Sequence, residues 1–319
     1  MFSAKSKRKK VTLISFCVFF QLMAGISFSR EKSIVINCDM QYQYAEECFD
    51  NGEYKTAILE FKRFIHFFPK EKRVTQAQFK TGASFFYLKQ YSDAVEFFQQ
   101  LSSSFSQDQV SVEARFMLSR TYLMMEKSGS AERVLQNFLT LTNDKSIKER
   151  IYSAIAWIYL KRAGEMGACA LDSAECWFDR ISSSGAEYYN KNEITKEISQ
   201  IRTIDKKNPV IAGTAALIPG AGFAYCERYR DALITFLLNT SLILAAAESF
   251  DDGNNALGAV ISFVEAGFYS GNIYGSISSA HKYNRFKIEQ RIHQMEKKYH
   301  GKTADFNDRK RMLSFQITF

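Results

Sequence analysis

Apolar residues recur at steps of three and four between residues 38 and 182, which is the spacing of one face of an α-helix. One alanine returns at a fixed place in this region, at Ala57, Ala94 and Ala131, thirty-seven residues apart each time. Each alanine follows an aromatic-rich segment and a short turn, and further aromatic residues follow it. Since such a period holds two helices and a turn, the pattern predicts stacked helix pairs, which present a concave face to other molecules.

The first unit shows how each pair is expected to form. Asn51 and Gly52 predict the turn between its two helices, because glycine tolerates the left-handed conformation at a helix end. Pro69 cannot continue the second helix and is expected to close the unit. The small residues Ala45 and Ala57 are expected where the two helices cross, because close approach leaves little room there.

Two further units repeat this plan, and a fourth is degenerate. Gly82 and Ser119 occupy the small position of the first helix in the second and third units. In the fourth unit we expect Gly164 and residues 167–170 to stretch the segment between the helices. The repeat region is therefore predicted to span residues 38–204, with three clear units and one uncertain one.

At these positions the chain resembles the tetratricopeptide repeat family. The matching features are the small residue of each first helix, Tyr54 and Tyr91 before the inner alanine, that alanine, and the closing Pro69. The long period and the Phe-x-x-Phe-x-x-x-Phe-Pro phrase are most similar to the versions found in the bacterial envelope. In that family the first helix of each unit lines the concave surface. The resemblance thus implies a groove for a protein or peptide partner, and its lining would be Tyr42, Glu46, Phe49, Phe79, Phe86, Tyr87, Phe116, Arg120 and Met124. The alternative is that most of these aromatic residues pack between neighbouring helices.

Composition changes after residue 207, and residues 208–284 are predicted to form an apolar helical domain. Residues 232–247 carry no charge, and residues 253–280 carry only Glu265. A soluble helix of this length would show a charged face, so the pattern favours a membrane-embedded hairpin with residues 251–255 at its turn. A deeply buried soluble bundle is the alternative.

Small residues recur at every fourth position of the second apolar helix, at Gly267, Gly271, Gly275 and Ser279. In lipid such a ridge lets a neighbouring helix approach closely, whereas in water each glycine would weaken the helix by about 1 kcal/mol. Polar groups are costly in a bilayer and should face a partner. The polar residues in question are Glu265, Asn272 and, on the preceding helix, Asn239.

A Pro-Gly-x-Gly-x-x-Tyr phrase precedes these helices, formed by Pro219, Gly220, Gly222 and Tyr225. The proline and glycines must interrupt any helix there. The phrase resembles that of a family of small membrane domains with paired helices, which implies location and not mechanism. A phosphate-cradling loop is excluded, because the required Lys and Ser or Thr are missing.

The two ends of the chain bear on its location. Residues 1–29 have the pattern of a secretory signal, with a basic start, an uncharged apolar run at residues 11–26 and small residues near residue 29. The tail, residues 285–319, is basic, which by the positive-inside tendency would place it in the cytoplasm. Exported repeats would then require an odd number of crossings. Residues 313–319 alternate and end in Phe, which resembles the last strand of outer-membrane barrels and leaves outer-membrane association open.

Charge and cysteine content narrow the partners. Residues 1–29 carry five cations and no acid, so a processed chain would carry +3 instead of the +8 of the whole chain. That charge is too small to indicate nucleic acid binding. Five cysteines remain, without a Cys-x-x-Cys pair, which argues against a zinc site or an all-disulfide framework. Cys169 and Cys176 could pair in an oxidising compartment, and inert buried thiols are the other interpretation.

No catalytic constellation, metal motif or cofactor site emerges from these residues. We therefore expect an all-α, non-enzymatic scaffold with exported, periplasmic repeats tethered to a membrane, the inner one in preference to the outer. The alternative is a component of an outer-membrane biogenesis or envelope transport assembly. A third hypothesis, an enzyme that uses Glu265 in a membrane cleft, has no motif to support it.

Overall fold

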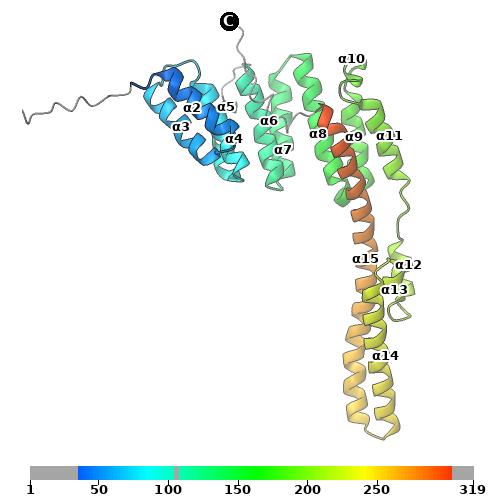
Figure 1. The fold of residues 1–319 in the computed structure, drawn as a ribbon. Coiled ribbons are helices and arrows are strands. Elements are labelled where there is room, and N and C mark those ends of the chain that lie inside the picture. Colours follow the sequence, from blue (N-terminus) through cyan, green and yellow to red (C-terminus); the bar gives the residue numbers. More distant parts are fainter. Residues whose placement is uncertain (1–34, 104–107, 304–319) are drawn as a thin grey trace, which may run out of the picture.

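The computed structural model describes residues 35–103 and 108–303, and every regular element in these ranges is a helix (Figure 1). The predicted all-α class is therefore confirmed for the described part of the chain. The predicted signal sequence and the alternating segment at residues 313–319 lie outside it.

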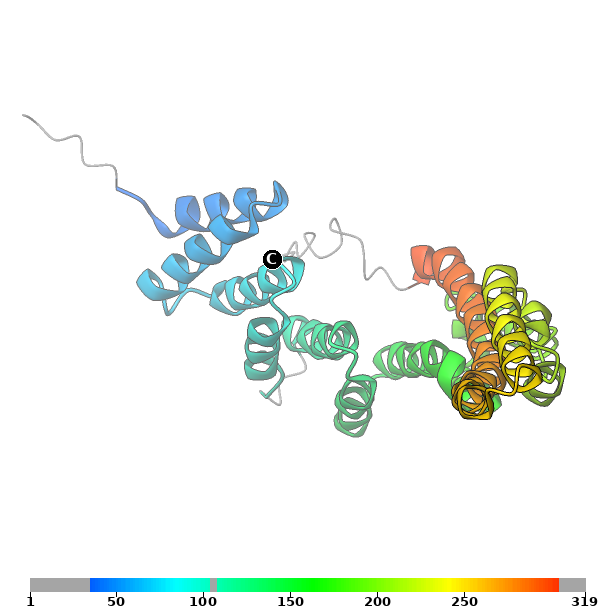
Figure 2. The ribbon, with the colours of Figure 1, turned by 90° about the horizontal axis from the view of Figure 1, so that it is seen from below.

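The N-terminal half consists of antiparallel helix pairs in a row, in which each helix packs against the next. Seen from below, the row is curved (Figure 2). The first three pairs are α2 (Cys38–Asp50) with α3 (Tyr54–Phe67), α4 (Val74–Tyr87) with α5 (Tyr91–Ser103), and α6 (Gln109–Met124) with α7 (Ser128–Leu141). The row continues with α8 (Lys145–Met166), α9 (Ala168–Asp179), α10 (Ser183–Ala186) and α11 (Lys191–Arg202).

The turns within the pairs repeat in backbone geometry as well as in sequence. Gly52, Lys89 and Glu126 have φ angles of 80°, 61° and 60°, and they are thirty-seven residues apart. The predicted turn at residues 51–52 is thus present and recurs with non-glycine residues. One period later Ala163 is buried inside α8, and the turn comes at Gly167 with φ 62°. The stretched connection expected in the fourth unit was wrong, because about one extra turn of helix takes its place.

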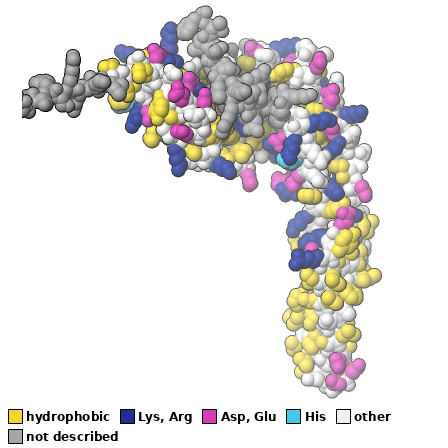
Figure 3. Space-filling model, in the orientation of Figure 1, with side chains coloured by type: hydrophobic (Ala, Val, Ile, Leu, Met, Phe, Trp, Pro, Cys, Tyr) yellow, Lys and Arg dark blue, Asp and Glu magenta, His cyan; other side chains and the backbone are white. Residues whose placement is uncertain are grey.

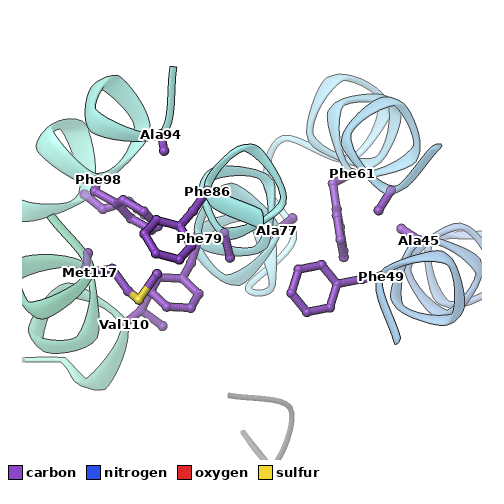
Figure 4. Close-up of a cluster of buried hydrophobic side chains, with 14 of the residues drawn as sticks. Ala45, Phe49, Phe61, Ala77, Phe79, Phe86, Ala94, Phe98, Val110 and Met117 are labelled. Carbon is purple, nitrogen blue, oxygen red and sulfur yellow. The ribbon is translucent and has the colours of Figure 1, made fainter. Parts of the chain in front are cut away.

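Small residues mark the helix crossings, as the repeat predicts. Ala45, Ala57, Ala94 and Ala131 are fully buried. Figure 4 shows Ala45 and Ala94 among the phenylalanines that fill the spaces between helices. A Cβ atom added at Gly82 would lie 3.1 Å from Phe97 Cβ and from Phe98 Cε1. The Ser119 hydroxyl donates a hydrogen bond to the Ala131 carbonyl at 3.0 Å, which joins the two helices of the third pair. The small residues that recur with the period of the sequence therefore allow neighbouring helices to pack closely.

The C-terminal part is a long helical hairpin that projects from the end of the row (Figure 1). Two short helices, α12 (Pro209–Ala215) and α13 (Ala221–Tyr225), lead into α14 (Tyr229–Asp251), which turns at residues 252–254 into α15 (Asn255–Thr303). The 49 residues of α15 correspond to a rod of about 74 Å. Its first half pairs with α14, and its second half returns to the row.

The boundary expected at residue 284 does not exist as a break, because α15 runs through it. Ile288, Ile292, Met295 and Tyr299 are buried in one hydrophobic cluster with residues of α8, α9 and α11. Their spacing of four, three and four residues is that of a helix face, a signal that the basic composition of this segment conceals. One face of residues 288–299 is thus part of the core, and this segment is not a separate tail.

The repeated turn generates a first prediction. Lys89 and Glu126 are exposed and hold positive φ angles that cost a non-glycine residue about 1–2 kcal/mol. We expect Lys89→Gly and Glu126→Gly each to raise the free energy of unfolding by roughly 0.5–1 kcal/mol, since glycine relieves this cost but loses more backbone entropy on folding. Urea unfolding followed by circular dichroism measures the change. The matched control, Gly52→Lys, should destabilise by a similar amount, and equal stabilities of all three variants would contradict the explanation.

Candidate functional site

The residues predicted to line the repeat groove divide into two groups. The rings of Tyr42, Phe49, Phe79, Phe86 and Phe116 are at most 7% exposed and lie in the core between helices. The side chains that remain at least partly accessible are Glu46, Tyr87, Arg120 and Met124. The surface that a partner could touch is therefore narrower and more polar than the sequence suggests.

The accessible groove residues lie on neighbouring first helices and are held by specific contacts. Glu46 pairs with Lys80, and Tyr87 stacks on Tyr54 with ring centroids 4.9 Å apart. The Arg120 guanidinium lies 5.0 Å from the centre of the Phe86 ring. Burial lowers the pKa of Arg120, and the Glu296 carboxylate of α15 acts in the opposite direction. The end of α15 therefore lies within electrostatic reach of this surface.

The second surface is the hairpin, whose apolar side chains face outward. Figure 3 shows the outer part of the hairpin covered by hydrophobic side chains, with acidic residues at the tip and basic residues at the neck. Only 11% of the apolar stretch of α14 is buried. On the hairpin the large side chains with at least 46% exposure include Tyr229, Leu233, Ile234, Phe236, Leu237, Ile243, Leu244, Leu257, Val260, Phe263, Phe268 and Tyr274. A patch of this extent is typical of a surface covered by lipid or protein.

The Pro-Gly-x-Gly-x-x-Tyr phrase folds the α12–α13 segment against the hairpin. Gly220, just after Pro219, has a φ of 82°, and a Cβ atom there would overlap the Ala232 carbonyl oxygen of α14. A Cβ atom at Gly222 would lie 2.6 Å from Ser276 Cβ of α15. The Tyr225 hydroxyl accepts a hydrogen bond from the Asn208 backbone N–H at 3.0 Å, which closes the loop. The motif therefore has a structural explanation, which is close packing at two glycines.

The glycine ridge of α15 is closely packed against another helix only at one end. A Cβ atom at Gly275 would lie 2.8 Å from the Phe223 ring of α13, whereas Gly267 and Gly271 have no atom within 4 Å of that position. The Ser279 hydroxyl accepts a hydrogen bond from Arg228 at 2.8 Å. The expected close approach of a neighbouring helix is therefore found at Gly275 and not at Gly267 and Gly271, because those two glycines border open space.

The polar residues of the hairpin are buried, and their hydrogen bonds are incomplete. Asn239 donates to the Thr235 carbonyl, and Asn272 donates to the Ala216 carbonyl, each at 2.8 Å. The amide oxygens of both side chains, and both carboxylate oxygens of Glu265, have no hydrogen-bond partner among the described residues. Among the described residues, Asn239 forms no hydrogen bond with Glu265 or Asn272, although all three were expected to face a partner.

Polar contacts join the end of α15 to the row of helices. Glu197 of α11 accepts hydrogen bonds from Arg291 at 2.5 Å and from Lys298 at 3.1 Å. A further ion pair, Lys161 to Glu296 at 2.8 Å, connects α8 to α15. Together with the buried cluster of α15, these contacts attach the hairpin to the repeats on more than one side.

The described residues contain neither a candidate metal site nor a disulfide. No group of three or more His, Cys, Asp or Glu among them could hold a metal ion. Cys169 and Cys176 are free and exposed on α9, so their interpretation as buried thiols was wrong. Two residues seven apart on one helix are separated by about 10 Å, too far for a disulfide. No protein-family model matches the chain, and no curated protein matches it either.

The contacts of Glu197 predict a pH dependence. Burial by itself raises the pKa of this carboxyl, but Lys298 and Arg291 outweigh it and hold the pKa below the usual range of a glutamate. A lowered folded-state pKa adds stability above the unfolded value, and this stability disappears as the pH falls through that range. We therefore expect Glu197→Gln to destabilise the protein by about 1 kcal/mol near neutral pH, because the two cations are partly exposed.

Thermal unfolding across a pH series checks this expectation. The difference between Glu197→Gln and the parent should shrink once the pH falls below about 4, where the glutamate of the unfolded chain is protonated. Glu193→Gln, on the exposed face of the same helix, should change little at any pH. A destabilisation by Glu197→Gln that stays constant down to the lowest pH would contradict the assignment.

Proposed function

We propose that this chain is a non-enzymatic scaffold that is held at a membrane by its hairpin and binds a protein or peptide partner through its helical repeats. One observation carries the proposal: an outward-facing apolar hairpin is continuous, through α15, with a row of helix pairs that has a conventional buried core. Contact with water is unfavourable for the exposed apolar surface of the hairpin and favourable for the row of helix pairs, whose apolar side chains are buried. The two parts therefore suit different solvents.

The dimensions of the hairpin support insertion into lipid. Among the described helices, α14 is the one that is long and apolar enough to cross a membrane, with 23 residues. Its length of about 34 Å matches the roughly 30 Å hydrocarbon core of a bilayer. The first half of α15 runs beside it, so both helices would enter the membrane together.

The course of α15 changes the expected topology. Residues between Ile288 and Tyr299 pack on the repeats, so this part of the tail and the repeats lie on the same side of any membrane that takes up the hairpin. In this proposal, exported repeats keep residues 285–299 on the exported side, and the hairpin crosses the membrane an even number of times. We keep the proposal that the repeats are exported. A secretory signal directs the domain that follows it across the membrane, and long domains are translocated largely regardless of their charge.

The repeats supply the binding half of the proposal. Their period and small-residue positions resemble tetratricopeptide repeats of the bacterial envelope, whose first helices face the partner. Glu46, Tyr87, Arg120 and Met124 are the accessible residues on the corresponding face. An arginine, an aromatic ring and a methionine together suit a peptide that presents acidic and apolar side chains.

A component of an outer-membrane biogenesis or envelope transport assembly is the second candidate function. The observation that favours it is the unfilled space beside Gly267 and Gly271, which a helix of an assembly partner could occupy. Separation of inner and outer membranes distinguishes the two: recovery with the inner membrane supports a tether, and recovery with the outer membrane supports biogenesis.

Membrane attachment generates the next prediction. Replacement of the exposed Leu237, Leu244 and Phe263 by Lys should move the protein from the membrane pellet to the supernatant of an alkaline wash. The reason is that each charge would cost about 2.5–3.5 kcal/mol in the hydrocarbon region, whereas none of the three side chains belongs to the core.

The control carries the same change at exposed apolar residues of the repeats, with Lys at Met40, Leu59 and Phe67. This variant should remain in the pellet with the parent. A parent chain that stays in the supernatant without detergent would refute the membrane half of the proposal.

Partner binding is tested at the accessible groove. We expect Met124→Glu combined with Tyr87→Ala to weaken capture of the partner by about ten-fold or more, as for residues that dominate an interface. A photo-crosslinker at Met124 identifies that partner in intact cells. Leu59→Glu, on the second helix of the first pair, is the matched exposed control. Equal capture by both variants, with unchanged folding, would show that this face is not the binding surface.

A further inference from the structure

Two adjoining hollows form a groove along one side of the hairpin, beside the unused part of the glycine ridge. They measure about 410 and 360 Å³ and share the side chains of Phe223, Ile234 and Thr235. The outer hollow, toward the hairpin tip, is bordered by Leu238, Val264 and Phe268 together with Gly267 and Gly271. The groove therefore has an apolar half in the part of the hairpin proposed to lie in lipid.

The other end of the groove is basic. The inner hollow includes Arg228 and Lys282, with Asp231 as its only acid. Arg228 pairs with Asp231 at 2.7 Å and donates a hydrogen bond to the Ser279 hydroxyl, whereas Lys282 has no ion pair among the described residues. A third hollow, of about 600 Å³, continues past Lys282 to Arg285, whose guanidinium is paired with Glu165 and Glu289. Basic side chains also mark this level on the surface, at the neck of the hairpin (Figure 3).

Polar atoms at the floor of the outer hollow indicate that the groove is built for an occupant. Asn239 and Asn272 line it, are 1% and 3% exposed, and keep amide oxygens without a hydrogen-bond donor. Leaving such a buried acceptor unpaired costs about 1–3 kcal/mol.

We infer that this groove binds one anionic phospholipid, with an acyl chain along Gly267 and Gly271 and the phosphate at Arg228 and Lys282. The division of the groove into an apolar length and a cationic end matches the two parts of such a molecule. Free phosphate would use only the cationic end, and a neighbouring helix would use only the glycines. The inference rests on the proposed insertion of the hairpin into a membrane.

The test uses the full chain purified in mild detergent, with lipid adducts counted by native mass spectrometry. Phosphatidylglycerol should bind more tightly than phosphatidylcholine of the same chain length. Lys282→Gln should weaken phosphatidylglycerol binding about five-fold, the effect of one cation at the headgroup level, and leave phosphatidylcholine unchanged. Gly271→Leu, which fills the open space, should weaken both lipids.

The matched control is Arg230→Gln, an exposed cation at the same end of the hairpin that does not line the groove. It should bind both lipids like the parent. Equal losses in Arg230→Gln and Lys282→Gln would show general attraction of anionic lipid and overturn the inference. Unchanged lipid binding by Gly271→Leu would also overturn the inference, as would displacement of the lipid by inorganic phosphate.

The alkaline wash of each variant keeps this test separate from the proposed function. All of these variants should stay in the membrane pellet, because none removes the outward-facing apolar surface. Loss of lipid preference with retained membrane attachment would refute the groove alone, whereas a parent chain free of membrane would refute the proposed function itself.

Discussion

The unbroken course of α15 is the constraint on which the rest of the molecule depends. One half of this helix presents Phe263 and Phe268 outward beside α14, and the other half buries Ile288, Ile292 and Met295 between α8, α9 and α11. Backbone hydrogen bonds run through the junction without a proline or a turn, so bending there would break bonds that nothing else replaces. The direction of the hairpin relative to the repeats is thus a property of one helix and not of a linker.

Both halves of the chain have small residues at helix contacts, but the consequences for packing differ. In the repeats, alanine or glycine at each crossing is buried completely, so neighbouring helices meet at a distance that the period reproduces. In the hairpin, Gly220, Gly222 and Gly275 are used in this way by the α12–α13 segment, while Gly267 and Gly271 border a hollow. Close packing therefore ends part of the way along the hairpin, and a groove begins there.

The hydrogen bonding of buried polar groups differs between the hairpin and the core of the row of helices. In the row of helices, buried Thr81 and Thr121 donate to backbone carbonyls one turn earlier, and Ser119 bridges two helices. In the hairpin, the oxygens of Asn239, Asn272 and Glu265 lack donors among the described residues. Since such groups are costly in any apolar surrounding, the hairpin is the part of the molecule that most needs something from outside to complete it.

The sequence by itself determined the helix pairs, because a strict period records helix length, turn position and the small residues at crossings in every unit. It also determined that residues 232–247 and 253–280 are apolar stretches long enough for helices, since solvent preference depends on side-chain type alone. Tertiary structure decided which aromatic side chains stay accessible, because Phe79 and Phe116 look like groove residues until neighbouring helices cover them. It also decided that residues 288–299 are part of the core, because the apolar face of this basic segment becomes buried only beside α8, α9 and α11. Period and composition are local properties of a chain, whereas burial depends on which distant segments meet.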